Sequence, residues 1–596
     1  MSPGYSLGMN PINRDILKLA VPSILANITV PIVGMVDIAV AGHLDASAAT
    51  LIGGIAVGAM LFDLLYWNFG FLRVGTGGLT AQAFGREDWK ECSRILTRAL
   101  GMSLAIACCL LLIQWVFVKA AFMVVDCSPE VQELASKYFF IRIWAAPATL
   151  SLMALKGWFI GMQDSVSPMV TDFVVNGMNI LMSIVLALGI SLPLSAPAVS
   201  DLAASAALAD STVFIASGVS DVIPGAVSGQ IGSEVIPVSR VLLPAMGFPG
   251  IAVGTVVAQY SGLFVALMIV MFKYRRKVFA DFALADLRGI FKGGETRRFF
   301  VMNADLFVRS LCFIAIYIGF TVISARYGDV LLAVSSIMMK ILMIFSYFTD
   351  GFAYAGEAMT GRYIGACDAV NLRKTVKWTF VWSMGLALLF IAIYHFGGVL
   401  LLRMMTSDAT VVEASRDFLP WLLLMPVVGC AAFTWDGIFI GATGSREMRN
   451  SMLWSVVAFA GVWFVGIFLL DTHSSDSAGI AASISLPTSS EPLSLPTPSE
   501  SLSLPTSSEY PFSVMNPSDT SFPVMNSAES SFPVSAPDMS TELLPAVSDQ
   551  NPSRTPGATA YGIIAMHILM AAYFAHLLAR TIYLTLKARA VLRLQK

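Results

Sequence analysis

The sequence predicts an all-α polytopic membrane protein with twelve transmembrane helices in two pseudo-symmetric six-helix bundles. The first observation is a mean hydropathy of +0.74 with only 13% charged residues, too few to cover a soluble chain of 596 residues. The second is that Gly-Trp-Phe-Ile-Gly at 157–161 recurs as Gly-Ile-Phe-Ile-Gly at 437–441, 280 positions later. The same offset of 280 relates Thr80, Gly85 and Asp88 to Thr360, Gly365 and Asp368. One offset shared by two segments indicates an internal duplication.

Twelve apolar runs are long enough to cross the membrane, since about 30 Å of hydrocarbon takes roughly 20 residues of helix. The runs are 16–41, 50–80, 97–120, 137–161, 168–190, 249–272, 299–323, 331–358, 376–401, 417–441, 451–470 and 558–584. Glycine and proline inside them are tolerated in membrane helices. The duplication divides the chain into an N-terminal lobe, 1–280, and a C-terminal lobe, 281–596.

The distribution of basic residues predicts the orientation. Lysine and arginine are concentrated in the loops after spans 2, 6 and 8 and in the C-terminal tail. By contrast, loop 191–248 has a single basic residue, Arg240, and loop 471–557 has a single one, Arg554. The excess of positive charge marks the cytoplasmic side, so we expect both termini there. Each half has an even number of spans, so both halves point the same way across a central cavity.

The two long outer loops, 191–248 and 471–557, lie between the fifth and sixth spans of each half. The second repeats short units of Leu, Pro, Thr, Ser and Glu. We predict that it is disordered, because such a composition buries too little apolar area to offset chain entropy. In the first loop, 211–218 has the pattern of a short strand. We interpret both inserts as tolerated linkers, with a capping or partner-binding role as the alternative.

Ionisable side chains inside spans are costly and are therefore functional candidates. Asp37 is the clearest, because apolar residues flank it and it lies about one turn below the predicted outer surface. Asn179 and Thr255 add polar oxygens on spans 5 and 6, so the three side chains can converge. The alternatives are a helix-end charge for Asp37 and helix–helix hydrogen bonds for the other two.

Other charged residues also lie within the spans. Lys156 and Asp436 are 280 apart, hold equivalent positions, and can meet when the bundles close on the inside. Alternatively, Lys156 reaches the interface and Asp436 acts within its own half. Asp305 and Arg309 are four apart on span 7 and can pair on one helix face. The remaining candidates are Lys340, Asp350 and Glu357 on span 8 and Asp63 and Arg73 on span 2, where we expect Glu357 and Arg73 to reach the inner interface.

Several motifs of enzymes are absent from the sequence. There is no Gly-x-x-x-x-Gly-Lys-Ser/Thr phosphate loop, no His-Glu-x-x-His zinc motif and no Gly-x-Ser-x-Gly elbow. We therefore predict a protein that is not an enzyme, has no cofactor or metal, and does not use ATP directly. We expect it to be a monomer that binds a small-molecule substrate and membrane lipids, and no nucleic acid.

Four motifs resemble the multidrug and toxic compound extrusion (MATE) family, in particular its DinF-like branch. They are Val-Asp-x-Ala-Val-x-Gly-His-Leu-Asp at 36–45, Gly-Leu-Thr-Ala-Gln-Ala-Phe-Gly at 78–85, Asp-Gly-Phe-Ala-Tyr-Ala-x-Glu-Ala at 350–358 and Asp-Gly-x-Phe-Ile-Gly-Ala-Thr-x-x-x-Glu-Met-Arg-Asn-Ser-Met at 436–452. The resemblance covers nearly the whole chain except the two inserts. It implies a MATE-type fold of two six-helix lobes, and export driven by inward flow of protons or sodium ions.

The resemblance also implies roles for single residues. Asp37 matches the family's coupling carboxylate, and Pro22 matches the proline at which the first helix bends. Asn179 and Thr255 match polar members of the same cluster. Ser183 stands where the family often carries an acid one turn after the asparagine, which favours protons over sodium. Asp436 matches an acidic position of helix 10 in another branch.

We therefore expect a multi-pass secondary exporter of the plasma (inner) membrane. It would move amphipathic organic compounds, drugs among them, by antiport with protons, and sodium is the alternative coupling ion. Three other functions stay open: an organic-acid exporter of citrate-like compounds, a flippase for a lipid precursor, and a non-transporting scaffold that displays the outer inserts.

Overall fold

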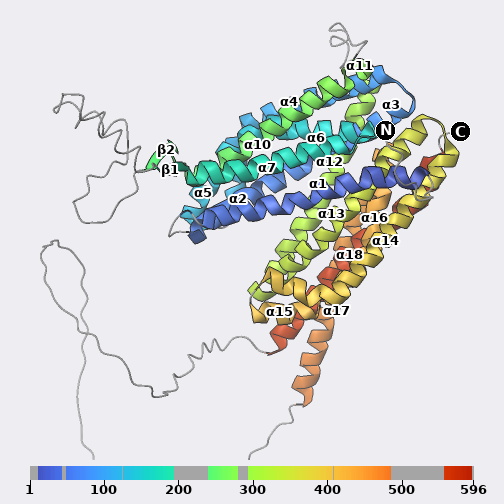
Figure 1. The fold of residues 1–596 in the computed structure, drawn as a ribbon. Coiled ribbons are helices and arrows are strands. Elements are labelled where there is room, and N and C mark those ends of the chain that lie inside the picture. The colour runs from blue at the N-terminus through green and yellow to red at the C-terminus, as the bar shows by residue number, and fades with distance from the viewer. Residues whose placement is uncertain are drawn as a thin grey trace, which may run out of the picture. The chain divides into compact units, whose positions relative to one another are not determined.

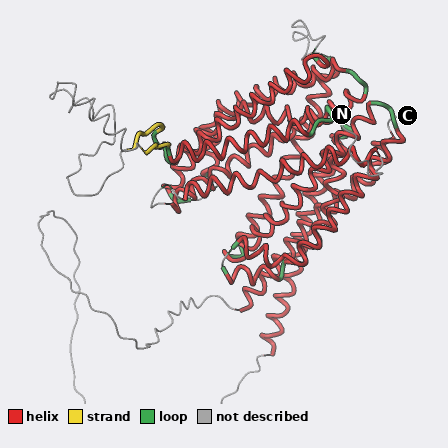
Figure 2. Tube along the Cα trace, viewed as in Figure 1, coloured by secondary structure: helices red, strands yellow, loops and turns green. Residues whose placement is uncertain are grey.

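The structure confirms the predicted class and the twelve spans. The computed structural model describes residues 11–42, 44, 48–123, 125, 127–193, 239–279, 293–406, 408–484 and 556–593. Almost all of these residues are helical (Figure 2), and twelve of the helices are long and apolar enough to cross a membrane. The strand expected at 211–218 and residues 485–555 of the second insert lie outside the described residues.

The N-terminal half forms one group of helices (Figure 1). Three of its spans are interrupted by short turns, which are 3-10 helical at η1 and η2 and π-helical at η3. Two strands, β1 (Ile190–Pro193) and β2 (Ser239–Leu243), pair antiparallel at the base of the first insert. The helical elements are α1 (Pro11–Gly42), α2 (Ala48–Trp67), η1 (Asn68–Gly70), α3 (Phe71–Gly85), α4 (Trp89–Phe122), α5 (Pro129–Arg142), η2 (Ile143–Ala145), α6 (Ala146–Gly161), α7 (Val166–Leu188), α10 (Phe248–Ile269), η3 (Val270–Tyr274) and α11 (Arg275–Val278).

The C-terminal half has longer uninterrupted helices. They are α12 (Gly294–Ala325), α13 (Asp329–Gly365), α14 (Ala369–Met405), α15 (Ala409–Arg416), α16 (Leu419–Gly441), α17 (Ser445–Ile484) and α18 (Pro556–Arg593). Residues 471–484, which we assigned to the disordered insert, are helical because α17 continues to Ile484. The first proline beyond the predicted span is Pro487, so every residue of this stretch has the backbone donor that a helix needs.

Two turns of the N-terminal half, after α3 and after α6, recur 280 residues later after α13 and after α16. Asp88 and Asp368 each cap the following helix, accepting a hydrogen bond from the backbone N–H of Glu91 at 2.9 Å and of Asn371 at 3.0 Å. A carboxylate at this position satisfies a backbone donor that the helix itself leaves unpaired. Four residues other than glycine adopt a positive φ in the described chain, and they form two pairs 280 apart: Glu87 (58°) with Cys367 (56°), and Gln163 (63°) with Thr443 (55°).

The repeated glycines let helices touch backbone to backbone. A Cβ on Gly157 would overlap the carbonyl oxygen of Arg73, and a Cβ on Gly437 would overlap that of Ala353. Arg73 and Ala353 are themselves 280 apart, so α6 packs on α3 in the same way as α16 packs on α13. Small residues at these crossings permit the close approach that packs helices in a membrane.

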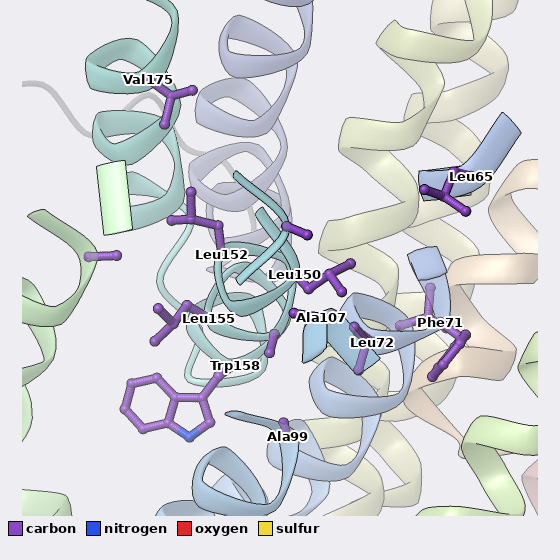
Figure 3. Packing of buried hydrophobic residues seen from close by; sticks show 14 of the residues in the cluster. Leu65, Phe71, Leu72, Ala99, Ala107, Leu150, Leu152, Leu155, Trp158 and Val175 are labelled. Carbon is purple, nitrogen blue, oxygen red and sulfur yellow. The ribbon is translucent and has the colours of Figure 1, made fainter. Parts of the chain in front are cut away.

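The core of the N-terminal half belongs to an apolar cluster around α6 (Figure 3), which continues into the C-terminal half through residues such as Phe299 and Phe439. Leu150, Leu155 and Trp158 are fully buried, each with 0% of its surface exposed. The indole nitrogen of Trp158 donates to the backbone carbonyl of Cys92 at 2.9 Å, which satisfies the one polar group of this buried ring. These contacts fix α6, and with it the short segment that leads into α7.

The two halves meet along α1, α3 and α13. Ile16 and Ala20 of α1 pack with Ala355 and Met359 of α13, and all four are fully buried. At the ends of α3 and α13 the backbones touch, because a Cβ on Gly365 would lie 3.0 Å from the Cα of Gly85. Contact between the halves therefore includes the turns after α3 and α13, which we predicted to face the cytoplasm.

Candidate functional site

The structure brings Asp37, Asn179, Ser183 and Thr255 together in the N-terminal half. The hydroxyl of Ser183 donates to Asp37 Oδ1 at 3.0 Å and lies 3.4 Å from Asn179 Oδ1. Asn179 Nδ2 donates to Thr255 Oγ1 at 3.0 Å. Their exposed fractions are 6% for Asp37, 4% for Asn179, 0% for Ser183 and 2% for Thr255, so the cluster is almost closed to solvent.

Glycines position this polar cluster. A Cβ on Gly250 would lie 2.6 Å from the backbone of Leu186, and one on Gly254 would lie 2.7 Å from the backbone nitrogen of Ser183. The two glycines are four residues apart on α10, the spacing that lets two membrane helices approach closely. The close contact of α10 with α7 places Thr255 against Asn179.

Arg142 is a functional candidate that the sequence analysis missed. Its Nη1 donates to the hydroxyl of Tyr138 at 2.9 Å, and its guanidinium lies 4.9 Å from the centre of the Phe62 ring. Its charge acts on the carboxylates of Asp37 and Asp63. The signal available in the sequence was an arginine inside the predicted span 137–161.

A central cavity of about 370 Å³ has walls from both halves. It is lined by aromatic side chains, which suit an amphipathic organic molecule: Tyr66, Trp67, Phe313, Tyr347, Phe433 and Tyr573. Six charged side chains also line it: Arg73, Arg309, Arg580, Asp350, Glu357 and Asp436. Lys340 is exposed on α13 and is not among the residues of this wall.

Asp436 and Lys156 each form ion pairs within their own half of the chain. They do not pair with each other in this structure, although the sequence suggested that they can. Asp436 forms ion pairs with Arg309 of α12 and Arg580 of α18. Lys156 forms an ion pair with Asp172 of α7. The physical reason is that neighbouring helices of each bundle already supply an opposite charge. The sequence alone does not mark Arg580 and Asp172 as partners, because each is one charge in its predicted span, 558–584 and 168–190.

Asp305 and Arg309 also pair with other helices and not with each other. Asp305 accepts hydrogen bonds from Arg449 Nη1 at 2.5 Å and from the hydroxyl of Ser445 at 2.9 Å, both on α17. Arg309 contacts Asp436 on α16. The two residues are one turn apart on α12, but each is next to a different helix that offers a better-placed partner. The expected pair within one helix is therefore wrong in this structure.

Glu357 and Arg73 form an ion pair with each other, which differs from the expectation that each extends separately to the inner interface. Arg73 Nη1 lies 3.1 Å from Glu357 Oε2, and the glutamate side chain is 0% exposed. The guanidinium of Arg73 also lies 4.3 Å from the centre of the Tyr354 ring. A Cβ on Gly77 would overlap the Glu357 carboxylate, so the glycine makes room for this buried charge.

A second cavity of about 230 Å³ adjoins the first on the N-terminal side. Lys156, Asp172 and Asn27 line it, and Arg73 and Tyr354 line both cavities. Pro22 lies inside the continuous helix α1, beside this region. Within the described residues, no three His, Cys, Asp or Glu side chains lie close enough to hold a metal ion.

Known proteins resemble this chain over most of its length. The sequence pattern of the MatE family matches residues 22–185 and 306–472. The DNA damage-inducible protein F of Escherichia coli (strain K12) is 31% identical over 75% of this chain and 84% of its own length. The probable multidrug resistance protein NorM of Photorhabdus laumondii is 22% identical over 76% of this chain and 86% of its own. A crystal structure of MATE in complex with MaL6 shares the fold, with a TM-score of 0.59, 15% identity, and coverage of 78% of this chain and 92% of that one.

Proposed function

This chain belongs to the MatE family of multidrug and toxic compound efflux transporters, and we propose that it exports amphipathic organic compounds by antiport with protons. The proton would bind Asp37, and the substrate would bind in the central cavity. The chain would span the inner membrane of a bacterial cell, and both termini would lie in the cytoplasm. Alternating access would then open the two bundles to one side of the membrane at a time.

The observation that carries the proposal is the hydrogen bonding of Ser183. Its hydroxyl donates to Asp37 Oδ1 at 3.0 Å and has a second acceptor, Asn179 Oδ1, at 3.4 Å. An ionised carboxylate only accepts hydrogen bonds, whereas a protonated one also donates. When Asp37 takes up a proton, Ser183 can turn its own hydrogen to Asn179 and accept one from Asp37. Proton uptake thus rearranges a buried contact between α1 and α7.

This rearrangement supplies a route from protonation to movement. Ser183 and Asn179 belong to α7, so Asp37 is the one carboxylate that ties α1 into the cluster. Protonation removes its negative charge and weakens its attraction to Arg142. α1 can then repack, with Pro22 as the weak point because a proline leaves one helical hydrogen bond unmade. Coupling requires that the two conformations differ in proton affinity, since a ligand shifts only equilibria between states that it binds differently.

The cluster favours a proton over a sodium ion. Sodium binding in a buried site needs several oxygen ligands and a compensating charge, and this cluster contains the single carboxylate of Asp37. The position of a second acid is occupied by Ser183. The test is efflux of fluorescent amphiphiles from proteoliposomes with an imposed proton gradient or an imposed sodium gradient. Efflux driven by sodium alone, at equal pH on both sides, would contradict proton coupling.

A further inference from the structure

Two arginines in the central cavity share one carboxylate. Arg309 of α12 and Arg580 of α18 both contact Oδ2 of Asp436, and all three side chains line the cavity. The side chain of Arg580 is 2% exposed, that of Asp436 is 11% exposed and that of Arg309 is 20% exposed. This group of three therefore has two positive charges against one negative charge in a largely buried site.

Another carboxylate that lines the cavity, Asp350, compensates this excess positive charge only in part. Asp350 of α13 acts electrostatically on both arginines, but it forms no ion pair with them among the described contacts. The Nε atoms of Arg309 and Arg580 are buried and have no hydrogen-bond acceptor among the residues that the structure describes. A guanidinium has five N–H donors in a planar fork that matches a carboxylate, so the pair has donors to spare.

From this arrangement we propose that Arg309 and Arg580 bind a carboxylate group of the transported substrate. The inference rests on the proposed export function and specifies its substrate class: an aromatic compound that carries a carboxylate. Phe313, Phe433 and Tyr573 line the same cavity and would pack against the aromatic part. If the substrate also carries an amine, Asp350 is the carboxylate placed to receive it.

The electrostatics argue against the simpler assignment of Asp436 as the site for a cationic substrate. An amine that displaced the two guanidinium groups from Oδ2 would leave both buried without their partner, and an amine at the unpartnered Oδ1 would stand beside both positive charges. Removing one partner of a buried ion pair is strongly unfavourable. A carboxylate ligand adds to the existing contacts and leaves Asp436 in place.

The test compares a matched pair of probes, 1-naphthylacetate and 1-naphthylacetamide, which differ in charge but hardly in shape. Binding is measured by tryptophan fluorescence on the full-length protein in lipid nanodiscs, without any ion gradient. We expect the carboxylate to bind about 10-fold or more tightly than the amide, the preference that charged hydrogen bonds confer. Equal binding of the two probes, or no binding of either, would overturn the assignment.

Arginine-to-lysine variants then locate the preference. Arg309→Lys and Arg580→Lys keep the positive charge but lose the planar fork, so we expect the preference to fall to about 2-fold or less. Arg98→Lys is the matched control, because Arg98 is also buried, at 5% exposure, but does not line the cavity. A preference that survives both cavity variants would place the carboxylate elsewhere and overturn the proposal.

Binding without a gradient separates this inference from the export function. If the carboxylate preference is present but no gradient drives efflux, the site assignment holds and the export proposal fails. If proton-driven efflux of neutral and cationic amphiphiles occurs while the carboxylate shows no advantage, the export proposal holds and the assignment to Arg309 and Arg580 fails.

Discussion

Arg73 of α3 and Glu357 of α13 form an ion pair across the two halves, with Arg73 Nη1 3.1 Å from Glu357 Oε2. The positions equivalent to them by the 280-residue offset are Ala353 and Gly77. The pair is therefore present once, although the backbone around it is repeated. It lies next to the close contacts of α3 with α13, so it links the buried surface between the halves to the wall of the central cavity.

We predict that Gly77→Val breaks this link. A Cβ on Gly77 would overlap the carboxylate of Glu357 and would lie 3.2 Å from the carbonyl oxygen of Gly157, so both the side chain and α6 must shift. Displacing one partner of a buried ion pair costs roughly 3–5 kcal/mol. The loss should appear as a lower unfolding temperature in nanodiscs. Gly385→Val on α14 is the control, because no atom lies within 4 Å of its Cβ position, and equal unfolding temperatures for the two variants would refute the argument.

A charge exchange at Lys156 should reveal which partner it uses. Lys156 and Asp172 form an ion pair in this structure. We expect Lys156→Asp and Asp172→Lys each to reduce transport, and the double variant to recover part of it, because the exchange restores opposite charges. The exchange of Lys156 with Asp436 should recover nothing, since it disturbs three ion pairs: that of Lys156 with Asp172 in one half, and those of Asp436 with Arg309 and Arg580 in the other. Recovery by that second exchange, at normal membrane levels, would instead show that Lys156 meets Asp436 during transport.

The helices and the repeat could be predicted from the sequence because both place strict requirements on residue type. A span needs a long apolar run, and the repeated turns need particular residues at fixed places. Asp88 and Asp368 cap equivalent helices, and Gly157 and Gly437 allow equivalent backbone contacts. The sequence pattern did not predict the end of α17, since a polar stretch without proline is compatible with helix or coil.

The polar cluster around Asp37 was predictable because its members are polar residues on otherwise apolar spans. The ion partners were not, because a partner depends on how the helices are rotated against one another. Arg580 contacts Asp436 from a helix more than one hundred residues away in sequence. Arg142 acts on Asp37 from a position near the start of its span, where an arginine is ordinarily an interface residue.

We predict a pH-dependent stabilisation by Asp164, which lies between α6 and α7. It accepts hydrogen bonds from Lys273 Nζ at 2.7 Å and from the hydroxyl of Tyr274 at 2.6 Å, and it also contacts Ser167. Burial raises the pKa of Asp164, but the hydrogen bonds from Lys273, Ser167 and Tyr274 outweigh burial, so the pKa is lowered below its ordinary value of 3.8.

The sign of the effect follows from this lowered pKa. The folded state holds the ionised carboxylate more strongly than the unfolded state does, so Asp164 contributes its full stabilisation above pH 3.8 and loses it as the pH falls through the lower folded pKa. Asp164→Asn should therefore unfold at a lower temperature than the wild type at pH 7, and the difference should shrink in strong acid. A difference that stays constant from pH 7 to about pH 2 would contradict this explanation.

The second insert should be dispensable for transport. Replacing residues 485–554 with a short Gly-Ser linker leaves the helical residues of α17 and α18 intact. Because loop-closure entropy changes slowly with loop length, we expect membrane levels and transport close to wild type. A scrambled insert of the same composition is the control for length. Loss of transport with both variants, at normal membrane levels, would show that the natural sequence of the insert binds a partner.

The strongest prediction concerns the proton at Asp37. Asp37→Asn keeps the size of the side chain and can still accept a hydrogen bond from Ser183, but it cannot gain or lose a proton. We expect normal insertion and substrate binding in nanodiscs, and efflux under a proton gradient reduced to about 1% or less of the wild-type rate, as for loss of an essential proton-transfer group. Asp37→Glu should keep part of the activity.

Ser183→Ala and Asp63→Asn separate the role of the proton from that of negative charge. Ser183→Ala removes the hydroxyl that turns between Asp37 and Asn179, so it should slow efflux and shift its pH optimum while leaving the carboxyl group in place. Asp63 is exposed and also lies in the field of Arg142, so Asp63→Asn removes a negative charge without touching the cluster and should transport normally. If Asp37→Asn transports at the wild-type rate under a proton gradient, Asp37 is not the coupling group and the rearrangement of Ser183 has no part in transport.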